Sequence, residues 1–270
     1  MFLVFSWTNR KELKDKIKIS VVEYLNATPF VYGLLNSGCL NTDDVQIDLD
    51  IPSVCAKKLV GRTVDIGLVP VAIIPKLKEH YILTDYCIGA DGKVNSVLLL
   101  SNVPMENIKT ILLDFHSRTS VALTRILAAK LWNISPEWKN AEEGFIASIH
   151  NETAGVVIGD RALAIKDNYR YCYDLSEEWR TLTDLPFVFA CWVANKKLSE
   201  DFTLAFSKAI EFGMKNKQKV IDEIVKSGKY TFDVDEYLNH YIQFNLDEDK
   251  KKGLSLFLDY LKDLTPILQK

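Results

Sequence analysis

The sequence has 270 residues, of which 48% are hydrophobic and 26% are charged. At about 150 residues per domain this length suggests two domains, and the composition is that of a globular protein, which excludes a disordered chain. Lys and Arg number 33 and Asp and Glu 36, so the formal net charge of −3 argues against nucleic-acid binding through a basic surface. No apolar run reaches the roughly 18–20 residues of a membrane helix, and the short apolar start has no cleavage site. We therefore expect a cytoplasmic protein without a membrane partner.

Cysteine and histidine usage gives no sign of a disulfide framework or a metal site. The five cysteines are odd in number and form no C-x-x-C pair, which predicts free, buried thiols. The four histidines are far apart and none has the spacing of a metal ligand, so we expect no metal. The glycine motifs of dinucleotide and nucleotide sites are also absent, and we expect no such cofactor.

In the first part of the chain, residues 1–16 are expected to form a peripheral extension. Alternating or β-branched apolar residues then predict strands at 16–22, 45–51, 64–69 and 94–100. Thr28, followed by Pro29, is expected to cap a helix that continues to Leu35. Ser53 is expected to cap a short helix that ends near Gly61.

The second part repeats the alternation of strands and helices. Strands are predicted at 108–113, 154–158, 171–175 and 187–193, with a helix at 121–132. Beyond residue 195 the pattern predicts amphipathic helices near 199–215, 217–227 and 233–262, the last broken around 245–247.

Two blocks of alternating strands and helices, followed by helices alone, predict an α/β protein. We expect two lobes with a ligand cleft between them. Residues 1–101 and 195–270 would form the first lobe, with the C-terminal helices packed on it. Residues 102–194 would form the second.

Two polar residues stand next to predicted strands where a ligand could bind. Asn26 follows the first strand, and ligands of open α/β sheets bind at the carboxyl ends of strands. Alternatively, Asn26 only forms a turn before Pro29, and the residues alone do not separate the two interpretations. Ser96 follows a glycine turn and could donate to an anion, although its position alone favours solvation of a strand edge.

Two further segments join a strand to a helix. Residues 117–120 (Ser-Arg-Thr-Ser) lead into a helix whose free N–H groups and dipole could bind an anion, with Arg118 as a clamp for a carboxylate. Simple capping beside a surface arginine explains the same pattern. Gly159 permits close backbone approach, and Asp160 is interpreted first as a helix cap. Thr183 and Asp184 could face the cleft.

Six segments, taken in order, resemble chorismate dehydratase, the first enzyme of the futalosine route to menaquinone. The resemblance runs from about residue 16 to residue 192. It rests on 22–26 (Val-Glu-Tyr-Leu-Asn), 67–72 (Gly-Leu-Val-Pro-Val-Ala), 96–99 (Ser-Val-Leu-Leu), 117–121 (Ser-Arg-Thr-Ser-Val), 158–160 (Ile-Gly-Asp) and 185–190 (Leu-Pro-Phe-Val-Phe-Ala). It implies a fold like that of type 2 periplasmic binding proteins. It also implies conversion of chorismate to 3-[(1-carboxyvinyl)oxy]benzoate without a redox cofactor or metal.

The resemblance also implies roles for particular residues. Chorismate loses its C3 proton and its C4 hydroxyl, and the family is thought to use the substrate's own enolpyruvyl carboxylate as the base. Asn26 would orient the substrate and assist the leaving group, and Ser96 would bind a carboxylate. The remaining substrate-binding candidates are Tyr24, Thr28, Ser117, Arg118, Thr119, Ser120, Gly159 and Asp160.

Three residues depart from the family's pattern, and two other functions remain open. Asp184 and Ser176 stand where the family often has Gly, and His116 is an unusual neighbour of the 117–120 segment. A charged Asp184 in the cleft would oppose a dicarboxylate. One alternative is the sister synthase that makes 1,4-dihydroxy-6-naphthoate, which shares the fold and uses a histidine. The other is a non-catalytic protein that binds a small carboxylate. A monomer or a homodimer is expected.

Overall fold

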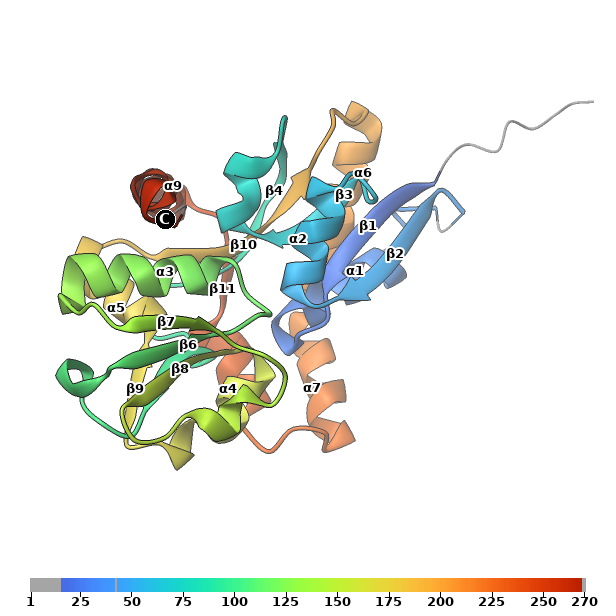
Figure 1. Ribbon diagram of the computed structural model, residues 1–270. Coiled ribbons are helices and arrows are strands. Elements are labelled where there is room, and N and C mark those ends of the chain that lie inside the picture. Colours follow the sequence, from blue (N-terminus) through green and yellow to red (C-terminus); the bar gives the residue numbers. More distant parts are fainter. Residues whose placement is uncertain (1–15, 42, 269–270) are drawn as a thin grey trace, which may run out of the picture.

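The computed structural model describes residues 16–41 and 43–268 and contains two β-sheets (Figure 1). The first has the order β11-β4-β10-β3-β1-β2 and the second β7-β6-β8-β5-β9. The strands of the first sheet are β1 (Ile17–Val22), β2 (Val45–Asp50), β3 (Ile66–Pro70), β4 (Tyr81–Ala90), β10 (Phe187–Ala194) and β11 (Gln243–Asn245). Those of the second are β5 (Val97–Ser101), β6 (Thr110–Leu113), β7 (Glu137–Asn140), β8 (Thr153–Ile158) and β9 (Tyr171–Asp174). The predicted two-lobed α/β architecture is confirmed.

Helices flank both sheets. The α-helices are α1 (Thr28–Asn36), α2 (Pro52–Val60), α3 (Thr119–Leu127), α4 (Asp160–Ile165), α5 (Leu175–Thr183), α6 (Glu200–Lys215), α7 (Lys217–Ser227), α8 (Val234–Glu236) and α9 (Glu248–Leu268). Short 3-10 turns occupy Leu25–Ala27, Val71–Lys76, Met105–Asn107, Phe145–Ser148 and Lys166–Asn168. Single π-helical turns follow α3 (Ala128–Trp132) and α8 (Tyr237–Tyr241).

The first sheet is parallel at one end and antiparallel at the other. β1 pairs in parallel with β2 and β3, whereas β10 pairs antiparallel with both β3 and β4. Every residue of β3 and β10 is buried, which fits the continuous apolar runs of both segments. The carboxyl ends of β1 and β3 therefore point to the same edge of this sheet, where the 3-10 turn with Asn26 begins.

The chain crosses between the sheets earlier than we expected from the sequence. β5 pairs with β8 and β9 and so belongs to the second sheet, although it falls within the predicted first lobe. β10 pairs with β3 and β4 and belongs to the first sheet. The crossings thus lie at residues 91–96 and 184–186, not at 102 and 194. Apolar strands look alike in sequence, and only their pairing shows which sheet they join.

One of the C-terminal helices contacts both lobes. α6 packs on α1, where Gly33 and Gly213 bring the two backbones into contact. α9 contacts β10 of the first sheet and also α3, which packs on β8 of the second. The ring of Trp179 in α5 packs edge-on against Phe257 of α9 and Phe187 of β10, at centroid distances of 6.2 and 5.3 Å. α9 therefore fastens the two lobes together.

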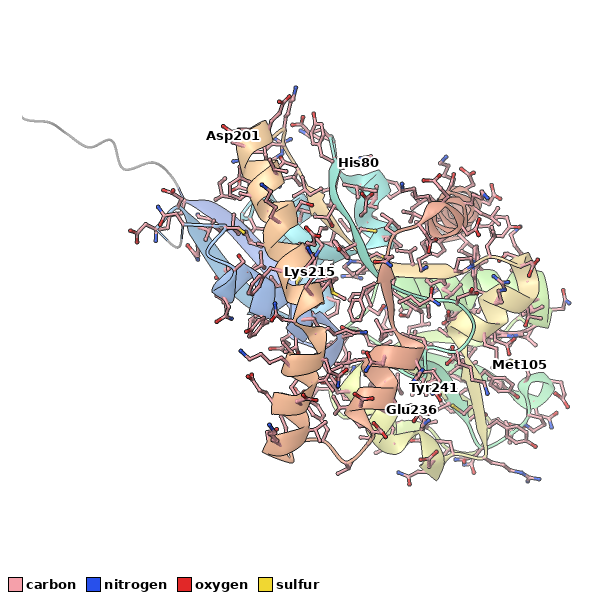
Figure 2. The ribbon with its side chains drawn as sticks, turned by 180° about the vertical axis from the view of Figure 1, so that it is seen from behind. His80, Met105, Asp201, Lys215, Glu236 and Tyr241 are labelled. Atoms are coloured by element: carbon pink, nitrogen blue, oxygen red, sulfur yellow. The ribbon has the colours of Figure 1, made fainter. Side chains whose placement is uncertain are left out.

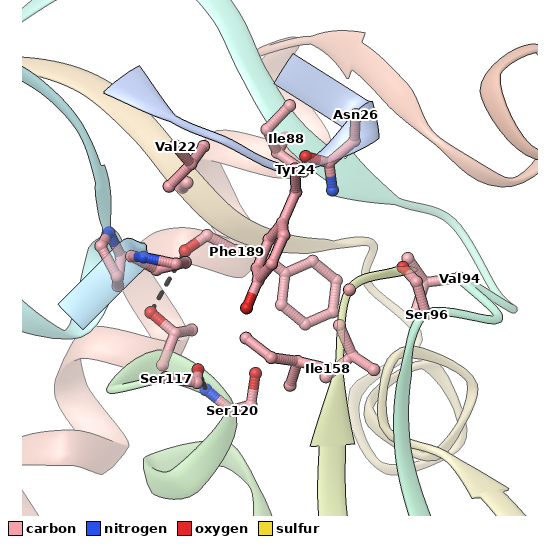
Figure 3. Close-up of a pocket in the computed structure, with 16 residues that line it drawn as sticks. Val22, Tyr24, Asn26, Ile88, Val94, Ser96, Ser117, Ser120, Ile158 and Phe189 are labelled. Atoms are coloured by element: carbon pink, nitrogen blue, oxygen red, sulfur yellow. Dashed lines mark hydrogen bonds between the residues drawn. The ribbon is translucent and has the colours of Figure 1, made fainter. Parts of the chain in front are cut away.

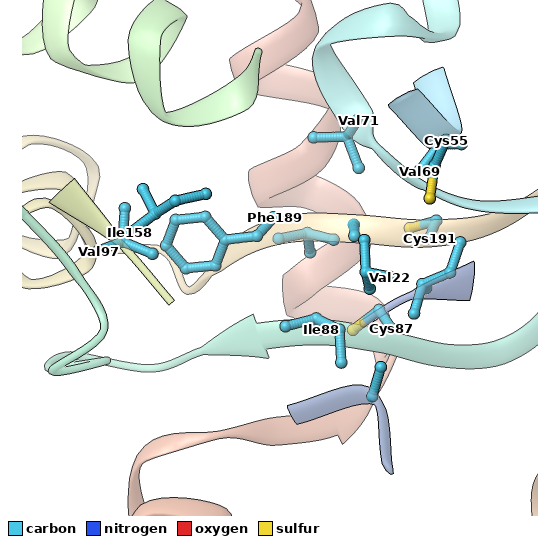
Figure 4. Close-up of a cluster of buried hydrophobic side chains, with 14 of the residues drawn as sticks. Val22, Cys55, Val69, Val71, Cys87, Ile88, Val97, Ile158, Phe189 and Cys191 are labelled. Atoms are coloured by element: carbon cyan, nitrogen blue, oxygen red, sulfur yellow. The ribbon is translucent and has the colours of Figure 1, made fainter. Parts of the chain in front are cut away.

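Several local expectations are wrong in detail. Ala27 and Ile51, not Thr28 and Ser53, are the N-cap residues of α1 and α2, and neither cap has a side-chain hydrogen bond. The strands β4, β7 and β11 were not predicted. Cys55, Cys87 and Cys191 are free and buried as predicted (Figure 4), but Cys39 and Cys172 are exposed.

The expected peripheral extension falls almost entirely outside the described residues. Within the described part of the chain, no helix is long and apolar enough to cross a membrane.

Candidate active site

A pocket lies between the two sheets and draws its walls from both (Figure 3). The space between its lining atoms measures about 530 Å³, part of it continuous with solvent. It is lined by Val22, Tyr24, Asn26, Pro52, Pro70, Ile88, Val94, Ser96, Val97, Ser117, Thr119, Ser120, Ile158, Gly159, Phe189 and Ala190. Its apolar wall continues into the buried cluster of Figure 4. Most of the predicted site residues therefore converge on this pocket.

Asn26 and Ser96 are joined through a residue that the sequence analysis missed. The Asn26 amide Nδ2 donates to the hydroxyl of Tyr237 at 3.3 Å, and Tyr237 donates to Ser96 Oγ at 2.8 Å. Tyr237 is 1% exposed and lies behind the two lining residues. Burial raises its pKa far above the ordinary value, so the phenol stays protonated. A residue from the C-terminal part thus links the turn after β1 to the segment that leads into β5.

Ser96 lies in a crossing segment that backbone hydrogen bonds hold in place. Asp174 Oδ2 accepts from the amides of Val94 and Asn95, at 2.9 and 2.7 Å, and Oδ1 accepts from the first turn of α5. Burial raises the pKa of Asp174 to about 6, although these amides oppose the shift. Asn95 is left-handed (φ 60°), and the carbonyl of Ser96 accepts from Gly159 at 2.7 Å.

The start of α3 supplies hydroxyl groups, as predicted, but not all of them face a ligand. Ser117 Oγ accepts from the Ser120 amide at 2.9 Å and so satisfies one of the free N–H groups in the first turn of α3. The Ser120 hydroxyl points into the pocket (Figure 3). The Thr119 hydroxyl accepts from the Ala72 amide at 3.2 Å and donates to the Phe189 carbonyl at 3.1 Å. Thr119 therefore ties α3 to the first lobe, and its only hydrogen is already used.

Tyr24 and Gly159 form one corner of the pocket. The Tyr24 hydroxyl hydrogen-bonds to His116 Nδ1 at 2.7 Å. Gly159 has φ 69° and ψ −153°, and a Cβ there would lie 3.0 Å from the Tyr24 ring. Both facts require glycine at this position. Burial raises the pKa of Tyr24, whereas burial and the charge of Arg161 lower the pKa of His116. Both groups are therefore neutral near pH 7.

The charged groups of this region lie behind the lining. Asp160 is the first residue of α4, not its cap, and its Oδ1 accepts from the Leu25 amide of the other lobe at 3.3 Å. Burial raises the pKa of Asp160. The fully buried carboxylate of Asp114 pairs with Arg161 at 2.6 Å. Among the described residues that line the pocket, none carries a carboxylate, an amine, a guanidinium or an imidazole.

The structure leaves several predicted residues outside the pocket. Thr28 lies in the first turn of α1, Arg118 is exposed, and neither contributes to the lining. The Thr183 hydroxyl donates to the Trp179 carbonyl. The Asp184 side chain is 95% exposed, and its left-handed backbone (φ 57°) ends α5, which is a position that favours Gly. Its charge therefore does not oppose a ligand in the pocket.

The part of the chain that the structure describes also holds no cluster of three or more His, Cys, Asp or Glu side chains placed to bind a metal ion.

The family model described as menaquinone biosynthesis matches residues 17–263. The chain belongs to this family. It is 27% identical over 256 residues to a curated chorismate dehydratase of Campylobacter jejuni (strain 81-176), covering 90% of this chain and 96% of the relative. It is 25% identical over 233 residues to the chorismate dehydratase of Thermus thermophilus, covering 78% and 84%. The resemblance seen in the sequence is confirmed.

Solved structures place this chain in a known fold. A protein from Archaeoglobus fulgidus matches with a TM-score of 0.73 at 15% identity, covering 92% of this chain and 97% of the other. A Candida albicans protein described as having the generic periplasmic binding protein fold matches with a TM-score of 0.63 at 14% identity, covering 93% and 91%. The predicted periplasmic-binding-protein-like fold is confirmed.

Proposed function

We propose that this protein dehydrates chorismate to 3-[(1-carboxyvinyl)oxy]benzoate in menaquinone biosynthesis by the futalosine pathway. The named relatives are chorismate dehydratases, and they match most of the chain. The observation that carries the proposal is the pocket between the lobes, whose polar lining consists of neutral hydroxyl and amide groups.

Such a lining suits a dicarboxylate. Asn26, Ser96 and Ser120 offer neutral donors, and the start of α3 adds the favourable end of a helix dipole. Donors fixed before the reaction stabilise charge as it develops, without reorganisation. The nearest carboxylates, Asp114 and Asp160, are engaged with Arg161 and with the Leu25 amide, so they do not repel the substrate from the pocket wall.

The absence of a basic side chain among the described lining residues fits a substrate that supplies its own base. In the proposed reaction the enolpyruvyl carboxylate takes the proton from C3, and the electron pair moves into the ring and its carboxylate. The C4–O bond then breaks, and the departing hydroxide takes up that proton and leaves as water. Ser96 and Ser120 hold the developing charge, and Asn26 orients the C4 hydroxyl.

Contacts between the lobes would exclude water from this reaction. The Asp160–Leu25 and Thr119–Ala72 hydrogen bonds and the Asn26–Tyr237–Ser96 chain all join the two sides of the pocket from behind its lining. The substrate therefore enters when the lobes separate and reacts when these contacts form again.

The test is to incubate the purified protein with chorismate and a chelator and to follow the product by mass and ultraviolet absorbance. We expect the loss of one water and the appearance of an aromatic ring. Asn26→Ala and Ser96→Ala should each lose most turnover while circular dichroism shows an intact fold. Near-normal turnover in both variants would refute the assignment of these residues.

A carboxylate-binding protein is the second candidate, because the fold is that of periplasmic binding proteins. In that case chorismate would raise the melting temperature and be recovered unchanged. A third candidate is the 1,4-dihydroxy-6-naphthoate synthase reaction, which needs a histidine. His116 touches Tyr24 behind the pocket wall but is not itself in the lining. Turnover of chorismate separates the proposed function from both.

A further inference from the structure

Tyr237 reaches the pocket from a segment with its own anchors. Tyr237 is the first residue of the π-helical turn after α8. The N-cap residue of α8, Asp233, accepts from the Glu236 amide at 2.9 Å. Lys217 of α7 donates to the Leu238 carbonyl at 3.1 Å. Figure 2 shows this segment, marked by Glu236 and Tyr241, next to α7. The hydroxyl of Tyr237 is therefore held in place by groups that lie outside the pocket.

The direction of the hydrogen bonds at Tyr237 follows from the chemistry of its partners. Among the described residues the Tyr237 hydroxyl has two hydrogen-bond partners, Asn26 Nδ2 and Ser96 Oγ. An amide nitrogen can only donate, so Tyr237 accepts from Asn26. The single phenolic hydrogen must then go to Ser96 Oγ, which lies 2.8 Å away.

We propose that Tyr237 is a positioning residue that turns the hydroxyl hydrogen of Ser96 into the pocket, toward a carboxylate of the substrate. Ser96 Oγ accepts from Tyr237, so its own hydrogen has to point elsewhere, and the pocket is the space that Ser96 lines. Each bond of the chain from Asn26 to Ser96 polarises the next, which strengthens the last donor. The inference rests on the proposed function, because it names what Ser96 donates to.

A fixed donor at Ser96 also affects which ligands bind. A serine hydroxyl that is free to rotate can donate or accept, whereas one that already accepts from Tyr237 is presented to the ligand as a donor. The site then favours an anionic oxygen at this point over an amide N–H or a hydroxyl hydrogen. Tyr237 thus contributes to specificity without touching the substrate.

The decisive experiment is a double-mutant cycle with Tyr237→Phe and Ser96→Ala. Tyr237→Phe removes the hydroxyl and keeps the ring, and we expect kcat/KM for chorismate to fall about 10-fold or more. In the Ser96→Ala background the same substitution should change kcat/KM by less than about twofold, because the residue through which it acts is gone. Tyr241→Phe is the matched control. Its hydroxyl lies in the same turn but donates to the exposed Glu236, and kcat/KM should stay unchanged.

Two results would overturn the inference. One is unchanged kcat/KM in Tyr237→Phe, and the other is fold-changes that multiply in the double variant as for independent residues. If Tyr237→Phe does not fold, the tyrosine ¹³Cζ signal of Tyr237 is compared in the unsubstituted protein and in Ser96→Ala. The signal should shift when its acceptor is removed, and an unshifted signal also overturns the inference.

Failure of the proposed function would look different. The unsubstituted protein would then leave chorismate unchanged, and the same four variants would be compared by the rise in melting temperature that chorismate causes. Tyr237→Phe should reduce that rise only when Ser96 is present. An equal reduction in both backgrounds would reject the role of Tyr237.

Discussion

Substitution of Gly159 by Ala tests the corner of the pocket where the backbone of Gly159 meets the ring of Tyr24. The backbone there has φ 69° and ψ −153°, a region that residues with a side chain almost never adopt. The new methyl group would also lie 3.0 Å from Cε2 and Cζ of Tyr24 and 3.1 Å from Cδ1. Tyr24 cannot withdraw freely, because its hydroxyl is bonded to His116 at 2.7 Å.

Two costs therefore add at this position. The backbone strain is worth about 1–3 kcal/mol, and crowding of a packed side chain adds about 1–3 kcal/mol. The free energy of unfolding should fall by about 2 kcal/mol or more. For a chain of this size that loss corresponds to a melting temperature lower by at least about 4 °C. Turnover of chorismate by the folded variant should also fall, because displacement of the Tyr24 ring moves its hydroxyl within the pocket.

Gly38→Ala is the control for a positive φ without crowding. Gly38 has φ 68°, and a Cβ there would meet no atom within 4 Å. Thermal unfolding and steady-state turnover are measured for both variants. Gly38→Ala should lose about 1 kcal/mol and keep full turnover. The reasoning fails if Gly159→Ala matches Gly38→Ala in both measurements, since the contact with Tyr24 would then cost nothing.

The other predictions concern Arg118, Ser120 and His116. Arg118→Ala should change kcat/KM for chorismate by less than about twofold because Arg118 is exposed and outside the lining, whereas Ser120→Ala should lower kcat/KM about 10-fold through loss of a donor to an anion. Initial rates over a range of chorismate concentrations give both values, and equal changes in kcat/KM would contradict the placement of these residues. Burial and Arg161 lower the pKa of His116, so its contribution to stability is present above its ordinary pKa of about 6.5 and is lost as the pH falls through the lowered folded value. An imidazolium has no acceptor nitrogen, so protonation reverses the bond to Tyr24 and kcat should fall on the acid side. His116→Gln should remove that acid limb of the pH profile, and an unchanged limb would exclude His116 as its cause.

Local patterns were enough to predict several strands of both sheets, including the ones next to Asn26 and Ser96. The β-branched run of 16–22 and the apolar run of 64–69 predicted the strands β1 and β3, because a strand buried on both faces has few polar residues. The rule that ligands bind at the carboxyl ends of strands placed Asn26 at a site, whereas the role of Ser96 came only from the family resemblance. A strand of this kind is recognised from residues that are adjacent in the sequence, so one sequence is enough to predict it.

Contacts between distant segments could not be predicted in this way. Tyr237 lies 141 residues from Ser96, in a π-helical turn that the sequence showed only as part of a long amphipathic stretch. Thr119 had the right residue type for an anion site, but its hydroxyl is used by Ala72 and Phe189. The expected lobe boundaries differ from those of the structure for the same reason. Only their pairing shows to which sheet the strands β5 and β10 belong.

The placement of charge explains how an acidic protein can offer a site to the proposed dianionic substrate. Carboxylates near the pocket are held one layer behind its wall, where Arg161 and backbone amides satisfy them. Their negative field is therefore compensated locally, and the ligand meets hydroxyl and amide hydrogens instead. A cationic lining would hold the two carboxylates about equally in chorismate and in the transition state, which lowers KM without raising kcat. Fixed neutral donors at the points where charge develops favour the transition state over bound chorismate, so such a lining suits the proposed catalysis better than simple retention of the ligand.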